Sequence, residues 1–438
     1  MLTRVVLLPR RLRLAFAVTL AALTGLAVTQ DAPAIPIPTN LAYVAPSGAL
    51  VTQTPGGETQ THGRDGARYA FPAWSPDGQQ LATIEREGTR ARAVVFTLNQ
   101  ASSTREVLLD DPQRAVIYLD WRDDGQAVYL LTNHPSGRYA LIEATRDGTR
   151  ELTTGAPLFW HEAPDGTLAV HLQNADGDQS FLLNPTTGAV TPLDPAGPYR
   201  SPAVSRSGRW LAGTVQPFGS ARIDVRRLPV GTAESARRQL DYAGLTAFAW
   251  SPQGPDRLAV IRPLVNAPHA FGPLGILDAE DGLYEPVTDA SVLAFWWSPA
   301  GDQIMFVASD PPGQDNVAEG GPRGPVLASA MPTAAPTPAP KRVQQNTPGF
   351  RVGVAGPGDG DATWLGGVRP SGRFLAEQLP FFDQYARSHR AWSHDGAMFV
   401  LPALDASGAA RLLLINPSEG RMMEGPYGSM PSWSPVAP

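Results

Sequence analysis

Ten consecutive residues near the C-terminal end bring together side chains that are often used for binding or catalysis. Residues 381–390 read FFDQYARSHR, and we single out Asp383, Tyr385, Arg387 and His389. An acid, a phenol, a guanidinium and an imidazole can between them donate, accept and transfer protons, and can pair with a charged ligand. One interpretation is a ligand or partner site. The other, which we favour, is an amphipathic cap whose three aromatic rings pack on the fold while the charges stay in water.

The sequence lacks most local motifs by which enzymes are recognised. It has no Gly-x-Ser-x-Gly pentapeptide, and its only lysine, Lys341, follows a proline rather than a glycine-rich loop. Cysteine is absent, which removes thiol nucleophiles and cysteine-ligated zinc. His161 and Glu162 begin like a metalloprotease helix, but Asp165 stands where the second histidine belongs. We therefore predict no catalytic residue, no metal ligand and no cofactor, and peptidase activity is not expected.

The composition favours short strands. The chain has 438 residues, of which 42% are hydrophobic, so a large core can form. Its 43 Gly and 44 Pro are typical of a protein with many turns rather than long helices. The formal net charge of −6 argues against a nucleic acid as the main partner.

A repeated pattern runs through residues 71–438. Each copy has an alternating apolar run that ends in an aromatic residue, a turn such as Ser-Pro-Asp-Gly, and a second alternating run. Alternation with a period of two predicts strands with one buried face, and the glycine supplies the positive φ of a tight turn. Most copies are 39–47 residues apart, which is room for about four short strands. We align them at Trp74, Trp121, Trp160, Val204, Trp250, Trp297, Trp392 and Trp433.

The motif Trp-Ser-Pro-Asp-Gly, intact at residues 74–78, resembles the TolB-type β-propeller repeat. The same repeat is similar to the non-catalytic propeller of prolyl oligopeptidase-like peptidases. The resemblance implies an all-β fold, a β-propeller of four-stranded blades. Counting the copies gives eight blades, or seven if the copy at Trp160 or Val204 is not independent. The chain ends one strand into a repeat at Trp433, so we expect the C-terminal strand to join the N-terminal strands near 41–63 and close the ring.

A propeller fold predicts which polar residues could lie together. We expect residues just before an inner strand to lie at the mouth of the central channel, which adds Asp120, Tyr199 and Arg200 to the candidates in 381–390. The motif tryptophans are expected in the core, and Trp296 and Trp364 are the exceptions that could be exposed.

Three segments depart from the repeat. Residues 1–30 carry four arginines before an uncharged run, which predicts a signal peptide or an N-terminal membrane anchor, and 31–40 is a Pro-rich linker. The propeller then spans 41–438 with an insertion at about 310–390, where one interval between copies is 95 residues long. Within the insertion, 310–349 is low-complexity and 371–390 is partly helical.

These features predict an exported protein, periplasmic, extracellular or anchored facing outside. We expect a non-catalytic binding or scaffold protein at the cell envelope, with a protein or cell-surface polymer as its partner. It is expected to be a monomer that meets the membrane only through its N-terminal segment. The alternative is an enzyme, a lyase or hydrolase, with its site in the central channel. Titratable side chains with shifted pKa values that converge in the channel would favour that alternative.

Overall fold

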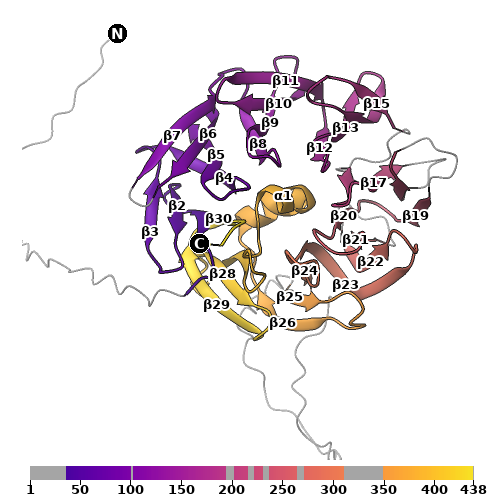
Figure 1. Ribbon diagram of the computed structural model, residues 1–438. Coiled ribbons are helices and arrows are strands. Elements are labelled where there is room, and N and C mark those ends of the chain that lie inside the picture. Colours follow the sequence, from indigo (N-terminus) through magenta and orange to yellow (C-terminus); the bar gives the residue numbers. More distant parts are fainter. Residues whose placement is uncertain are drawn as a thin grey trace, which may run out of the picture. The chain divides into compact units, whose positions relative to one another are not determined.

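The protein is all-β, with short antiparallel sheets arranged around a central axis (Figure 1). The computed structural model describes residues 36–99, 102–193, 202–215, 221–229, 236–263, 271–309 and 349–437. This arrangement confirms the predicted all-β propeller class. Many strands are buried on both faces, because the sheets present apolar faces to one another, and the core lies between neighbouring sheets.

Within the described residues, five sheets have four strands each. The first contains β30 (Ser429–Trp433), β1 (Leu41–Val44), β2 (Leu50–Gln53) and β3 (Thr59–His62). The second contains β4 (Arg68–Trp74), β5 (Gln80–Glu87), β6 (Arg90–Leu98) and β7 (Ser103–Leu109). The third contains β8 (Val116–Trp121), β9 (Val128–Asn133), β10 (Tyr139–Thr145) and β11 (Gly148–Gly155). The fourth contains β12 (Leu158–Glu162), β13 (Leu168–Asn174), β14 (Gly177–Leu183) and β15 (Val190–Pro192). The fifth contains β16 (Ala203–Val204), β17 (Trp210–Val215), β18 (Arg222–Arg227) and β19 (Arg237–Asp241).

Two further sheets complete the described part of the ring. A seven-stranded sheet contains β20 (Ala247–Trp250), β21 (Arg257–Ile261), β22 (Gly272–Asp278), β23 (Tyr284–Trp297), β24 (Ile304–Ser309), β25 (Phe350–Ala355) and β26 (Thr363–Val368). β23 pairs mainly through its first half with β22 and through its second half with β24, with a register shift in each pairing. The last sheet contains β27 (Phe399–Leu404), β28 (Ala410–Asn416) and β29 (Arg421–Tyr427). Its inner edge is extended by a bridge between Trp392 and Phe399. Divided within β23, these sheets are compatible with the larger of the two predicted blade counts.

The first sheet is assembled from both ends of the described chain. β1 pairs antiparallel with β30, with Leu41 opposite Trp433. The Thr39 hydroxyl donates to the Val436 carbonyl at 2.8 Å, and the Ser434 N–H donates to the Asn40 carbonyl at 2.8 Å. This pairing covers the edge of β1 that would otherwise present unpaired backbone groups.

The tryptophan of the repeated motif links neighbouring sheets. In five copies the indole N–H donates a hydrogen bond to a backbone carbonyl of the preceding copy. The acceptor is the residue that comes directly before the motif position of that copy. These bonds run from Trp74 to Ser432 (2.9 Å), Trp121 to Ala73 (2.9 Å), Trp250 to Ala203 (2.9 Å), Trp297 to Ala249 (3.0 Å) and Trp392 to Trp296 (3.1 Å). The side chain therefore fills the space between sheets and also satisfies a backbone acceptor there. We call this bond the indole link.

One position of the predicted alignment is wrong. The turn after each motif residue is closed by the same backbone bonds, from Gly78 N–H to Ser75 carbonyl in the intact copy and from Gly166 N–H to Ala163 carbonyl in the fourth. Ala163 therefore matches Ser75, so Glu162 and not Trp160 occupies the tryptophan position. The sequence misled because an aromatic residue lies only two positions earlier. With Glu162 in place, the Asp123 N–H of the preceding sheet donates to its carboxylate at 2.9 Å, and the indole link is replaced by a carboxylate link.

The stretch before Trp392 is helical. It begins with the π-helical turn η2 (Phe374–Gln378), continues through the 3₁₀ turn η3 (Leu379–Phe381) and ends in α1 (Phe382–Ser388). In Figure 1, α1 lies at the centre of the ring, surrounded by the inner strands. Its contacts include β8 of the third sheet and both β20 and β23 of the seven-stranded sheet. No helix in the described part of the chain is long and apolar enough to cross a membrane.

Candidate functional site

The helix α1 is packed into the centre of the ring by its aromatic side chains. Phe382 is buried and meets Phe295 edge-on, with ring centroids 5.3 Å apart. Tyr385 stacks on Phe71 at 4.9 Å and meets Tyr118 edge-on at 5.1 Å. The helix is therefore held from opposite sides of the ring, and its side chains fill the middle of the central channel.

A buried chain of hydrogen bonds fixes the C-terminal end of α1. The Tyr118 hydroxyl lies 2.9 Å from the Ser388 hydroxyl and donates to the Gln384 carbonyl at 3.2 Å. The Ser388 hydroxyl in turn lies 2.6 Å from Nδ1 of His389. Burial lowers the pKa of His389 to about 4, so this imidazole is neutral at pH 7. Arg387 donates from Nη2 to the Trp160 carbonyl at 2.6 Å, which ties the helix to the fourth sheet as well.

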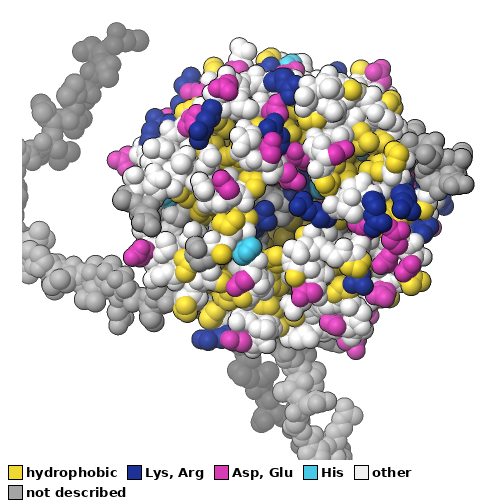
Figure 2. All heavy atoms as spheres, in the orientation of Figure 1, with side chains coloured by type: hydrophobic (Ala, Val, Ile, Leu, Met, Phe, Trp, Pro, Cys, Tyr) yellow, Lys and Arg dark blue, Asp and Glu magenta, His cyan; other side chains and the backbone are white. Residues whose placement is uncertain are grey.

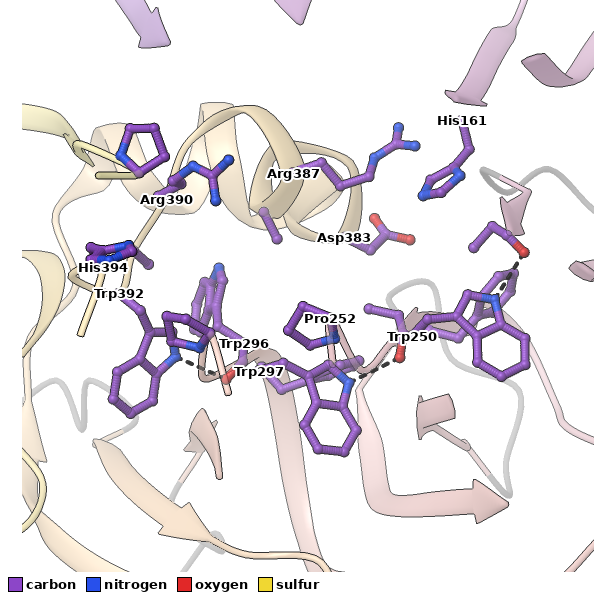
Figure 3. A pocket seen from close by; sticks show the side chains of 18 of the residues that line it. His161, Trp250, Pro252, Trp296, Trp297, Asp383, Arg387, Arg390, Trp392 and His394 are labelled. Atoms are coloured by element: carbon purple, nitrogen blue, oxygen red, sulfur yellow. Dashed lines mark hydrogen bonds between the residues drawn. The ribbon is translucent and has the colours of Figure 1, made fainter. Parts of the chain in front are cut away.

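A cavity of about 270 Å³ lies on one side of α1. Its aromatic wall is formed by the linked tryptophans Trp250, Trp297 and Trp392 (Figure 3). The helix contributes Asp383 and Arg387, and Arg390 follows just after it. Figure 2 shows basic side chains gathered around a hollow at the centre of the same face, with acidic side chains nearby. We call this space the central cavity.

Two arginines, Arg387 and Arg390, line the central cavity. Among the described residues, neither Arg387 nor Arg390 makes an ion pair with a carboxylate. Arg387 is half-buried and Arg390 is exposed to the cavity. The surrounding protein lowers the pKa of Arg390 by desolvation, while Asp120 and Asp123 oppose that change. A guanidinium titrates far above pH 7, so Arg390 remains cationic despite this change.

Acidic side chains near the two arginines hold their protons unusually tightly. Burial raises the pKa of Asp120 to about 7, although Arg387 and Arg390 act in the opposite direction. Burial also raises the pKa of Glu162 to about 8, assisted by Asp123 and Asp120. At neutral pH these two carboxyl groups therefore carry much less negative charge than free carboxylates would.

His161 completes this side of the cavity. Burial lowers its pKa well below the ordinary value, and the charge of Arg387 acts in the same direction. Its Nδ1 accepts a hydrogen bond from the Val204 N–H at 3.2 Å, which leaves the other ring nitrogen as the N–H donor. Figure 3 shows His161 and Arg387 on the same side of the cavity, pointing toward each other.

The structure brings five of the predicted site residues together: Asp120, Asp383, Tyr385, Arg387 and His389. Asp383 and Arg387 line the central cavity, and Asp120 lies within electrostatic reach of Arg387. Tyr385 and His389 pack on the opposite side of the helix, around a small second cavity. The other two predicted residues, Tyr199 and Arg200, lie outside the described residues.

Four residues of the site are not among the predicted candidates. His161 and Glu162 lack the second histidine of a metalloprotease helix, and neither Arg390 nor His394 is a predicted site residue, yet His161, Arg390 and His394 line the cavity. A signal was present for two of them. His394 replaces proline in the turn motif, and Glu162 replaces tryptophan once the fourth copy is aligned by its turn. No cluster of three or more histidines and acids in the described part of the chain is arranged to hold a metal ion.

Solved structures with the same fold have several different activities. TolB from Acinetobacter baumannii is 18% identical, with 57% of this chain and 64% of TolB covered and a TM-score of 0.38. The dihydro-heme d1 dehydrogenase NirN is 14% identical, with 92% and 76% covered and a TM-score of 0.53. A prolyl endopeptidase is 11% identical, with 83% and 50% covered and a TM-score of 0.49. The chain thus spans just under two thirds of the TolB length.

No family model and no curated protein matches the sequence. The structural likenesses, at these identities, concern the fold alone, and the sheets described above make that fold a β-propeller.

Proposed function

We propose that this chain is an exported, non-catalytic binding protein that takes a protein partner at the cell envelope. The partner docks on the face where the central cavity opens. One observation carries the proposal: α1 occupies the centre of the ring, so this face offers a closed recess with aromatic walls instead of an open passage. Recesses with rigid aromatic walls and a few polar groups are typical binding sites. The basic N-terminal segment supports export.

The absence of cysteine from the chain allows a sharp test, because one introduced cysteine is the only site of labelling. His394 is exposed at the cavity, so His394→Cys places a photoactivatable maleimide crosslinker there. Val190→Cys, on the outer strand β15 and 53% exposed, is the matched control. Both labelled proteins are illuminated with solubilised native envelopes and recovered through a C-terminal tag.

We expect a discrete protein adduct from the cavity label that the control does not give. The same adducts from both labels, or none from either, would contradict docking at this face. An adduct that resists protease but is shortened by glycan-degrading enzymes would replace the protein partner with a cell-surface polymer. Fractionation of the native cells tests export separately, since the proposal requires the protein outside the cytoplasm.

A second candidate function, a lyase or hydrolase sited in the channel, is favoured by one observation. Asp120 and Glu162 both have raised pKa values and lie within electrostatic reach of each other, as an acid–base pair in a catalytic site would. The test is turnover of an envelope glycan or a lactone by the purified protein. Turnover that is lost in both Asp120→Asn and Glu162→Gln would establish this enzymatic function and replace the proposed binding function.

A further inference from the structure

The central cavity offers many hydrogen-bond donors and few acceptors. The indole N–H groups of Trp250, Trp297 and Trp392 are already bonded to backbone carbonyls, so these residues present ring faces and edges to a ligand, with no free donor. The donors left are the remaining N–H groups of Arg387 and Arg390, one ring N–H each on His161 and His394, and the indole N–H of Trp296. A ligand that complements this cavity must therefore be an acceptor, and the two cations favour an anion.

Asp120 offsets the arginine charge only in part at neutral pH. Its pKa is raised to about 7, and it forms no ion pair with Arg387 or Arg390. Asp383, on the helix itself, supplies one carboxylate to the lining against two guanidinium groups. The positive potential of the arginines therefore remains available to a bound group.

The apolar part of the cavity limits the shape of the ligand. Four tryptophans, Trp250, Trp296, Trp297 and Trp392, line it together with Pro252 and Pro299. Flat indole surfaces next to rigid proline rings accept aromatic or branched apolar groups and give a hydroxyl-rich sugar few partners. A volume of about 270 Å³ suits one or two amino-acid residues or a small organic acid.

We propose that the central cavity binds a carboxylate attached to an apolar or aromatic body, with the carboxylate on Arg387 and Arg390 and the body against the tryptophan wall. This inference rests on the proposed function and names the group that the partner presents. The carboxylate can belong to a small acid or to the C-terminus of a polypeptide, since both have the same chemistry.

The test uses the whole protein and matched pairs of probes. Binding of 3-phenylpropionate and of its amide is measured by calorimetry and by the change in tryptophan fluorescence. The tripeptide Ala-Pro-Phe, with a free or an amidated C-terminus, is titrated in parallel. We expect each acid to bind, and each amide to bind at least about tenfold more weakly than its acid. A loss of this size is usual when a hydrogen bond to a charged group is removed. Tighter binding of the tripeptide than of the small acid identifies a polypeptide end as the source, and equal binding identifies a small acid.

Two variants separate specific binding from loss of structure. Arg390→Gln removes one cation that has no ion pair to lose, and we expect it to weaken acid binding about tenfold while amide binding stays unchanged. Arg421→Gln, an exposed arginine on β29, is the control and should bind both probes as the native protein does. Unfolding curves that match the native protein show that a change in affinity is not a loss of fold.

The pH dependence gives an independent readout. Acid binding should weaken as pH rises from 6 to 9, because Asp120, which interacts electrostatically with both arginines, then becomes negative. The other titratable groups near the arginines are Asp123, Asp383, His161 and His394. Equal affinity for acid and amide, no binding of either acid, or an Arg390→Gln variant with undiminished preference would each overturn the inference. A partner adduct without acid binding refutes this inference alone, whereas acid binding without a partner adduct refutes the proposed function.

Discussion

The carboxyl group of Asp120 gives a quantitative test of the electrostatics of the site. Its pKa in the folded protein is raised from the ordinary 3.8 to about 7, chiefly by burial. The folded protein therefore keeps this proton up to about pH 7, whereas the unfolded chain releases it near pH 4. Folding is favoured in acid by this group, and the advantage is lost as pH rises through 7.

The size of the effect follows from the two protonation equilibria. With a folded pKa of about 7, the group favours the folded state by about 1.4 kcal/mol more at pH 6 than at pH 8. Asp120→Asn keeps the size of the side chain and cannot ionise. The free energy of unfolding of the native protein, measured relative to this variant, should therefore fall by about 1.4 kcal/mol between pH 6 and pH 8.

Urea unfolding followed by tryptophan fluorescence at the two pH values measures this difference directly. Glu58→Gln, at an exposed acid in the turn before β3, serves as the control, and its difference from the native protein should not follow this pattern. If the native protein and Asp120→Asn keep a constant difference across this range, then Asp120 is not buried as described. The arginines of the central cavity would then face a negatively charged Asp120 at neutral pH.

Three other changes test the packing of the ring by urea unfolding. Trp297→Phe removes the indole link to Ala249 and should lower the free energy of unfolding by about 1–2 kcal/mol. Trp364→Phe on β26, whose ring lies under Arg351, should lower it less, and equal losses would contradict the role of the link. Gly78→Ala should lower the free energy of unfolding by about 1 kcal/mol more than Gly166→Ala. Both glycines have positive φ, but only at Gly78 would an added Cβ run into Val436. A smaller difference would mean that the C-terminal segment does not pack there. Trp433→Ala should cost about 3–5 kcal/mol, since the residue is fully buried in the strand that joins β1, and a marginal effect would show that this join contributes little.

The fold was predictable because its signal is local and repeated. The turn, the glycine and the motif aromatic all lie within about five residues, so each copy can be recognised without its neighbours. The same locality caused the error at Trp160. That residue is buried and has the expected composition around it, and only the backbone bonds of the turn show that Glu162 holds the linking position.

The site was less predictable because it depends on where α1 lies. The segment 381–390 was recognised by its composition, but its place at the centre of the ring comes from contacts with Phe71, Phe295 and Tyr118, which are far away in the sequence. The same contacts explain why Trp296 is buried, at 8% exposed, against the expectation that it could lie at the surface. Its ring packs on Phe382 of the helix. Trp364, the other exception, is half-buried.

The join between β1 and β30 has a consequence for how the protein is made. Thr39 and Val436 are 397 positions apart, so the first sheet cannot gain its innermost strand until the ribosome has made β30. Contacts of such long range form late, after the local hairpins. Until then β1 presents an open edge that another chain can pair with. Newly made protein should therefore be most prone to aggregate in this interval. A peptide with the sequence of β30, added during refolding, should pair with the free edge of β1 and prevent the chain's own β30 from joining it.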